Sequence, residues 1–187
     1  SLDNKFDSIW LMDDDGYPEK QALQKLIENF KSSFSCISSL VVDETNHAKL
    51  VFPMPYLSES KYFRIFFSIF KFRNYKLLHN KKNKFYNFCH LFNGALIKTQ
   101  TIAQIGNVNI NYFLYGDEVD YFNRLKQNGK IVTLTNCFHF HPPRANNAVS
   151  SSWVFYTLKN TIINNFKYRK FPHFYNLAII FLVLYRI

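Results

Sequence analysis

The sequence predicts an α/β domain, and three observations indicate this fold class. The chain has 187 residues, of which 48% are hydrophobic, so it is long and apolar enough to bury one core. Its first third reads as strand, helix and strand in turn. Residues 130–141, KIVTLTNCFHFH, form a further strand that two prolines stop.

Each element near the N-terminus follows from its local pattern. Residues 8–12 read as a short buried strand, and residues 36–43 and 49–52 as later ones. We expect the helix between them to begin at Pro18, because proline suits the first helical position and Glu19 suits the positive end of a helix. The apolar residues of this helix recur at helical spacing: Ala22, Leu23, Leu26, Ile27 and Phe30.

The middle of the chain is strongly basic and aromatic. Residues 61–84 carry eight Lys or Arg and no acid. An i, i+3, i+4, i+7 pattern within them predicts an amphipathic helix with a basic side, formed by Phe63, Phe66, Phe67 and Phe70. Such a helix would lie on an anionic membrane or reach over a bound phosphate. Packing against the core, with the basic side in water, is the alternative.

Further along, a turn at Asn93 and Gly94 is expected to lead into a helix. Residues 116–129, GDEVDYFNRLKQNG, read as a helix that begins at the acids and ends at Gly129 as its C-cap. In the strand that follows, His139 and His141 face the same side because strand side chains alternate.

We expect residues 151–187 to form a helical, basic and aromatic tail close to a membrane. Residues 153–168 read as a helix, and a basic patch precedes the apolar run 177–185, an order typical of an interfacial anchor. That run is shorter than the roughly 20 residues that a membrane span needs. Because the chain opens on Ser and stops just after this run, we expect it to be part of a longer protein.

The net charge of +10 suggests a polyanionic partner, and its distribution is more informative than its size. Residues 60–187 contain only three acids, which are Asp117, Glu118 and Asp120. Because this region contains no other carboxylate side chain, we expect the cluster to have a functional role. The cysteines Cys36, Cys89 and Cys137 are widely spaced without a C-x-x-C pair, which fits a reduced, cytoplasmic setting.

The first acidic cluster, Asp13 to Asp15, directly follows the first strand, where open α/β sheets bind ligands. Asp13 and Asp15, spaced i and i+2, can coordinate Mg²⁺ or Mn²⁺ together with diphosphate oxygens. Asp14 would point elsewhere, to a ribose hydroxyl or a neighbouring base. Capping of a helix is the alternative, although one aspartate would be enough for that and three adjacent charges repel one another.

In the second cluster, a carboxylate after the aromatic turn 111–116 can act as a general base toward a substrate hydroxyl. Helix capping is again the alternative. An imidazole beside carboxylates suits a transition metal such as Mn²⁺, and the pattern leaves open whether His139 or His141 supplies it.

Four segments in this order, WLMDDDGYP, FNGALI, YGDEVDYFNR and GKIVTLTNCFHFH, resemble the catalytic domain of family-2 glycosyltransferases of the GT-A fold, in the galactofuranosyl- and rhamnosyltransferase branch. The resemblance covers roughly residues 5–165. It implies a mixed sheet flanked by helices, with residues 1–150 as the C-terminal part of the catalytic domain. The nucleotide-binding strands of the family would precede residue 1. It also implies an inverting transferase that uses a nucleotide-diphospho-sugar donor and Mn²⁺ or Mg²⁺.

The resemblance also assigns roles to residues. Asp13, Asp15 and His141 match the metal and diphosphate ligands, and Glu118 matches the catalytic base, with Asp117 as the alternative for that role. Donor or acceptor contacts are expected from a wider set: Asp14, Asn93, Gly94, Asp120 and Trp153. For Trp153, stacking on a sugar face competes with plain core packing.

Together these observations predict transfer of a galactofuranose- or rhamnose-type sugar to a hydroxyl of a cell-surface glycan or lipid-linked acceptor. The expected place is the cytoplasmic face of a bacterial membrane, on its anionic surface and with no nucleic-acid partner. Two rivals remain. One is a metal-dependent phosphatase or nuclease, which also uses clustered aspartates. The other is a non-enzymatic basic module that binds membrane or nucleic acid through residues 61–84 and 167–170.

Overall fold

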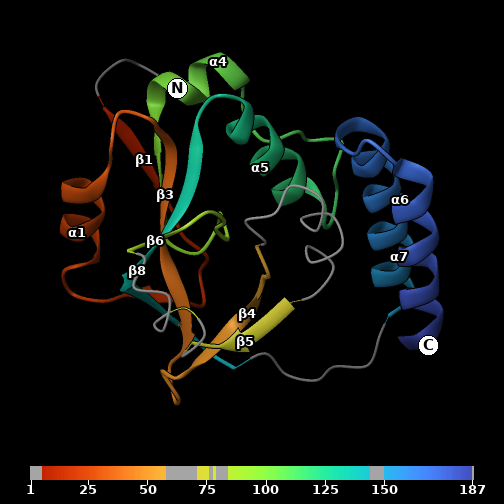
Figure 1. The fold of residues 1–187 in the computed structure, drawn as a ribbon, viewed down its shortest axis with the longest axis horizontal. Coiled ribbons are helices and arrows are strands. Elements are labelled where there is room, and N and C mark those ends of the chain that lie inside the picture. The colour runs from red at the N-terminus through yellow and green to blue at the C-terminus, as the bar shows by residue number, and fades with distance from the viewer. Residues whose placement is uncertain (1–5, 58–70, 76–77, 79–83, 144–149, 187) are drawn as a thin grey trace.

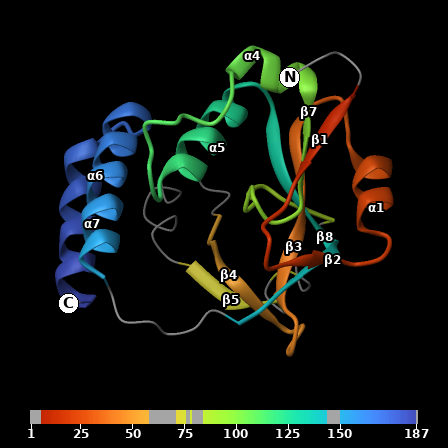
Figure 2. The same cartoon turned by 180° about the vertical axis from the view of Figure 1, so that it is seen from behind.

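The computed structural model describes residues 6–57, 71–75, 78, 84–143 and 150–186. In these residues the chain is a mixed α/β structure, in which one curled sheet runs through the molecule and helices cover it (Figures 1 and 2). The predicted α/β fold class is confirmed at this level. The finer GT-A assignment remains a prediction.

The sheet is built around two long strands, β3 (Phe34–Asp43) and β8 (Lys130–His141), which pair in parallel. All ten residues of β3 are buried, as expected for a strand that helices cover on both faces. The strand order is β1-β7-β3-β4-β5, and β8 also pairs with β2 and β6. The shorter strands are β1 (Ser8–Leu11), β2 (Tyr17–Pro18), β4 (Lys49–Pro55), β5 (Lys71–Asn74), β6 (Phe85–Tyr86) and β7 (Ala95–Lys98).

The helices divide between the two faces of this sheet. Helix α1 (Ala22–Asn29) packs on one face, against Ile37, Leu96 and Val132. Helices α4 (Thr99–Ile105) and α5 (Asp117–Gln127) pack on the other face. Helices α6 (Ser151–Tyr168) and α7 (Pro172–Arg186) lie side by side beyond α5 (Figures 1 and 2).

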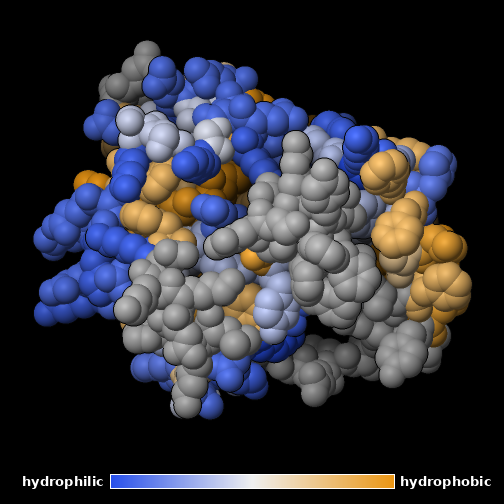
Figure 3. Space-filling model, viewed as in Figure 1, coloured by the Kyte–Doolittle hydropathy of each residue, from blue (hydrophilic) through white to orange (hydrophobic). Residues whose placement is uncertain are grey.

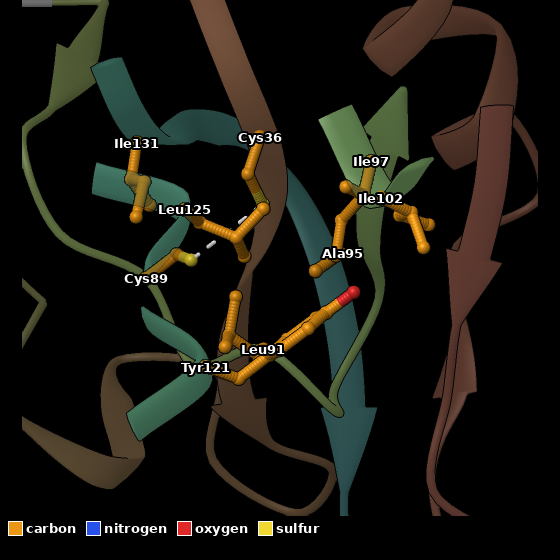
Figure 4. Close-up of a cluster of buried hydrophobic side chains, with 9 residues drawn as sticks. All are labelled: Cys36, Cys89, Leu91, Ala95, Ile97, Ile102, Tyr121, Leu125 and Ile131. Carbon is orange, nitrogen blue, oxygen red and sulfur yellow. Dashed lines mark hydrogen bonds between the residues drawn. The ribbon is translucent and has the colours of Figure 1, made fainter. Parts of the chain in front are cut away.

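The core beneath α4 and α5 fixes both the sheet and the segment before β7. Leu125 and Tyr121 of α5 meet strand residues such as Ile97 and Ile131, and Cys89 and Leu91 insert into the same cluster (Figure 4). All three cysteines are free thiols in this structure. The backbone on either side of residue 90 is therefore anchored in the core.

The sequence predicted several of these elements correctly. The expected strands near 8–12, 36–43, 49–52 and 130–141 are found as β1, β3, β4 and β8. The helix over 116–129 is α5, and the helix over 153–168 is α6. Gly129 follows the end of α5, where a Cβ would approach Ser35 N to 2.9 Å, so glycine is needed for close packing there.

Other expectations were wrong. Pro18 does not begin a helix, because Tyr17 and Pro18 pair with β8 as β2, and α1 starts only at Ala22. The carboxylate of Glu19 accepts hydrogen bonds from Phe138 N and Lys25 Nζ rather than capping a helix.

The turn at Asn93 and Gly94 leads first into β7, which inserts between β1 and β3. Only then does helix α4 follow. Both β2 and β7 form because they pair with strands far away in the sequence, and a local sequence pattern carries no information about such pairing.

Two predictions concern the membrane. The amphipathic helix expected around 63–70 lies outside the described residues. Among the helices that are described, none is long and apolar enough to cross a membrane. Helix α7 nevertheless keeps several large apolar side chains more than half exposed, and apolar atoms gather over α6 and α7 at the right of Figure 3. These α7 side chains are Phe174, Leu177, Phe181 and Leu184.

Candidate active site

The aspartate turn is held at both ends by sheet pairing. β1, which precedes it, pairs with β7, and β2, which follows it, places Pro18 opposite His139 in β8. The turn between them carries Asp13, Asp14 and Asp15 on the surface. Because β8 continues to His141, this pairing brings the end of β8 next to the turn.

Asp13, Asp15 and His141 come together in space. One ligand atom from each lies within 4.8 Å of the other two, a separation that suits a shared cation. His141 Nε2 is 3.1 Å from Asp15 Oδ1, and the imidazole is buried while both carboxylates are exposed. His141 Nδ1 lies 2.7 Å from Pro142 O, to which it can only donate. In the neutral ring this fixes the tautomer and leaves the Nε2 lone pair for a metal.

The electrostatics of the turn favour a cation. Partial burial, followed by the charges of Asp15 and Asp14, raises the pKa of Asp13 above its usual value, and His141 and a hydrogen bond from Asn93 only partly oppose this. Two carboxylate oxygens and one imidazole nitrogen form a donor set that Mn²⁺ accepts, and Mg²⁺ also binds such carboxylates. The residues present therefore fit the predicted ion.

His139 occupies a different place from His141, although both side chains are buried. Its ring lies between two glycines: a Cβ at Gly94 would come within 3.1 Å of Nδ1, and a Cβ at Gly16 would overlap Nε2. Burial lowers the pKa of His139 to about 4, with the neighbouring His141 adding to the effect. Of the two histidines left open by the sequence, His141 is the one that belongs to the cluster.

The four other residues expected to contact donor or acceptor are spread out. Asn93 is buried beside Asp13, and among the described residues its Oδ1 has no hydrogen-bond partner, so a polar ligand would satisfy it. Asp14 is exposed on the turn. Gly94 is internal: its N–H donates to Leu11 O, and its φ of 84° needs glycine. Trp153 is half-buried in the first turn of α6.

Glu118 and Asp117 lie at the first turn of α5, where the helix dipole favours negative charge. Glu118 Oε1 accepts a hydrogen bond from Leu91 N at 2.8 Å and lies 3.8 Å from His90 Nδ1. Its side chain is 39% exposed, so a substrate can still reach the carboxylate. Asp117 is half-buried on the same turn.

Residues 88–93 connect this carboxylate to the cation cluster. Leu91 and His90 contact Glu118, and Asn93 reaches Asp13. The ring of Phe52 lies 5.2 Å from the imidazole of His90 and 5.1 Å from the ring of His141. Phe52 therefore contacts both the histidine beside Glu118 and the histidine of the cation cluster.

Asp120 does not face this site, contrary to its expected contact with donor or acceptor. Its side chain is 1% exposed and accepts from Arg124 Nε at 2.9 Å, Lys167 Nζ at 2.8 Å and Tyr168 Oη at 2.6 Å. Burial raises its pKa, but the hydrogen bonds from Lys167 and Tyr168 outweigh this and leave the pKa lowered. Asp120 is a structural anchor between α5 and α6.

Sequence reasoning missed an asparagine pair in α6. Asn160 Nδ2 donates to Leu114 O and Tyr115 O at 2.7 and 2.6 Å, and Asn164 Nδ2 donates to Gly116 O at 2.8 Å. This Asn clamp, Asn160 with Asn164, holds the turn from which α5 begins. Its i, i+4 spacing was the available signal, but such polar pairs more often face water. His90 was also missed, because a single histidine has no motif spacing.

The chain has a distant similarity to a known glycosyltransferase. No protein-family model matches the chain. The galactofuranosyltransferase GlfT1 of Mycobacterium tuberculosis, from strains CDC 1551 / Oshkosh and ATCC 25618 / H37Rv, is 29% identical over 141 residues. The match covers 73% of this chain and 43% of each relative, so the chain spans less than half of their length. This distant similarity suggests a relationship with glycosyltransferases.

Proposed function

We propose that this chain carries the catalytic carboxylates of an inverting glycosyltransferase with the GT-A fold of family 2. The donor would be a nucleotide-diphospho-sugar of the galactofuranose or rhamnose type, and the acceptor a hydroxyl of a cell-surface glycan or lipid-linked glycan. The observation that carries the proposal is the cluster of Asp13, Asp15 and His141, linked to Glu118 through residues 88–93. The similarity to a galactofuranosyltransferase supports the same reaction class.

Asp13, Asp15 and His141 would hold Mn²⁺ or Mg²⁺. The bound ion would neutralise the donor diphosphate and stabilise the charge that develops on it as the leaving group. Asn93, whose Oδ1 lies buried next to Asp13, would accept a hydrogen bond from a donor group. Asp14 and Trp153 remain proposed contacts of the substrates.

Glu118 would act as the general base. Its carboxylate would take the proton of the acceptor hydroxyl as that oxygen attacks the anomeric carbon from the face opposite the diphosphate, so the configuration inverts. The N–H of Leu91 holds one carboxylate oxygen in place, and exposure of the side chain leaves it accessible. Asp117, one residue earlier, is the second carboxylate within the same turn.

The proposed setting is the cytoplasmic surface of a bacterial membrane. Support comes from the exposed apolar side chains of α7 and from Arg169 and Lys170, which directly precede that helix. No acid occurs after Asp120, so this end of the chain would not repel anionic lipids. A lipid-linked acceptor would then meet the site at the membrane surface.

Sugar transfer by the full-length gene product tests the proposal. UDP-galactofuranose and dTDP-rhamnose are each supplied with a glycan acceptor, with and without Mn²⁺, and product is followed by mass spectrometry. We expect metal-dependent transfer from one donor, a fall in kcat of at least about 100-fold in Glu118→Gln, and unchanged donor affinity. Glu28→Gln, an exposed change in α1, is the matched control and should leave transfer unchanged.

Three results would contradict the proposal. Phosphoester hydrolysis without any sugar acceptor would favour the phosphatase or nuclease class. Full activity in Asp13→Asn together with Asp15→Asn would exclude a catalytic role for the cluster. Poor donor binding by Glu118→Gln would remove Glu118 from the role of base, because a base acts on the acceptor.

A further inference from the structure

His90 lies beside the proposed base in a position that the backbone fixes. Its neighbours Cys89 and Leu91 are 1% and 0% exposed and belong to the core cluster beneath α5 (Figure 4). With both neighbours inserted in the core, the side chain of His90 lies outside that cluster and next to Glu118. Movement of the chain at residue 90 would require the core to open.

Two aromatic rings hold the imidazole itself. The ring of Phe52 lies 5.2 Å and that of Phe88 5.1 Å from the ring of His90, at interplanar angles of 42° and 83°. Phe88 in turn packs against Phe122 of α5, one turn after Glu118. The ring of His90 is therefore fixed relative to the helix that carries the base.

The contacts from this segment converge on one oxygen of the base. Leu91 N donates to Glu118 Oε1 at 2.8 Å, and His90 Nδ1 lies 3.8 Å from the same atom. The hydrogen bond from Leu91 N restricts the rotation of the carboxylate, and the imidazole lies within ion-pair distance of the same oxygen. When His90 is protonated, its charge also stabilises the ionised form of Glu118, which is the form that can accept a proton.

We propose that His90 is a positioning residue for Glu118: it holds the carboxylate in its orientation and keeps it ionised for proton transfer. This inference rests on the proposed function for its catalytic meaning, but the pairing itself can be tested without substrate. His90 would not touch the substrates and acts through Glu118.

Within the described part of the chain, three further titratable groups lie near His90 or Glu118, which are Asp117, His141 and Cys89. Asp117 precedes Glu118 on α5, and His141 lies beyond Phe52. Burial raises the pKa of the Cys89 thiol well above its usual value, so it stays neutral. From β4, the apolar ring of Phe52 contacts His90. Among the described carboxylates, Glu118 is the one placed to affect His90 most, because its Oε1 lies 3.8 Å from Nδ1.

The first test measures the pairing in the full chain by NMR titration of the histidine ring protons. The signal of His90 is assigned from its loss in His90→Phe. We expect the pKa of His90 to fall by about one unit in Glu118→Gln, because an opposite charge within about 4 Å is removed. A shift of less than about 0.3 unit would overturn the proposal.

The second test follows the reaction. His90→Phe preserves ring packing but removes the nitrogen, so we expect kcat to fall at least about tenfold with an unchanged KM for the donor. The acidic limb of the pH profile should move to higher pH by about one unit, because Glu118 then loses a neighbouring positive charge. Glu28→Gln, an exposed change on α1, is the control and should leave both values unchanged.

The outcomes separate the two proposals. A coupled titration in a full-length protein that transfers no sugar would support the pairing and contradict the glycosyltransferase function. Normal transfer with an unmoved acidic limb in His90→Phe would overturn the role of His90 and leave the function intact.

Discussion

Replacing Asp120 with asparagine should destabilise the fold by about 3 kcal/mol. Removing one partner of a buried ion pair costs about 3–5 kcal/mol, and the Asp120 carboxylate is 1% exposed with three donors around it. Lys167 keeps 47% of its side chain in water and can rehydrate, so its share is reduced by solvent screening. Asn also retains one acceptor oxygen. The lower end of the range is therefore expected.

The pH dependence of this loss follows from the two pKa shifts. The pKa of Asp120 is lowered in the folded protein, so its contribution is present above its unfolded value of 3.8 and disappears as the pH falls through the folded pKa. The pKa of Lys167 is raised to about 12 by the hydrogen bond to Asp120, so its contribution is complete below its unfolded value of 10.5. The difference between variant and wild type should stay constant from about pH 5 to 9 and shrink below about pH 4.

Urea unfolding at several pH values and thermal unfolding, both followed by circular dichroism, measure the loss of stability and its pH dependence. A loss of 3 kcal/mol corresponds to a fall in Tm of about 6–12 °C for a chain of this size. Asp117→Asn is the matched control, because it lies on the same turn and should cost no more than about 1 kcal/mol through the helix dipole. A loss below about 1 kcal/mol for Asp120→Asn, or one that grows as the pH falls below 4, would refute the buried network.

Three further predictions concern the site and its support. Gly16→Ala should weaken Mn²⁺ binding at least about tenfold by calorimetry, because a Cβ there overlaps the ring of His139 and displaces the aspartate turn. Asp13→Asn should slightly stabilise the metal-free protein, because it removes repulsion from the neighbouring carboxylates. The same change should abolish the rise in Tm that Mn²⁺ causes. In the wild type, that rise should become smaller as the pH falls through the raised pKa of Asp13. Asn160→Ala should cost about 2 kcal/mol in urea unfolding, because two carbonyls of the turn before α5 lose their donor.

Short-range patterns predicted those elements whose signals are local. β3 and β8 are rich in apolar and β-branched residues, and α5 combines acids in its first turn with a glycine after its end. β2 and β7 lacked such signals. Tyr17–Pro18 is a strand only because β8 lies beside it, and a proline at that point equally suits a helix start.

The site could be predicted in part for the same reason. Asp13 and Asp15 follow an apolar strand, and His141 ends another, so their chemistry was visible before their proximity was known. The roles of His90, Asn160 and Asn164 were not visible. Their roles depend on contacts with residues that are far away in the sequence: Glu118 for His90, and residues 114–116 for the two asparagines. Such contacts produce no periodic pattern in the sequence.

Helix α6 ties the C-terminal helix α7 to the proposed base. In the described ranges, six hydrogen bonds join residues on either side of the boundary predicted at residue 150. Four connect the Asn clamp with residues 112–116 before α5, and two connect Lys167 and Tyr168 with Asp120. Helix α7 is joined to α6 by Asn165 Nδ2, which donates to Asn176 Oδ1 at 2.8 Å. If α7 rests on a lipid surface as proposed, the packing of α6 between α7 and α5 would determine the distance of Glu118 from that surface. The reach of a lipid-linked acceptor would then be set by these asparagines.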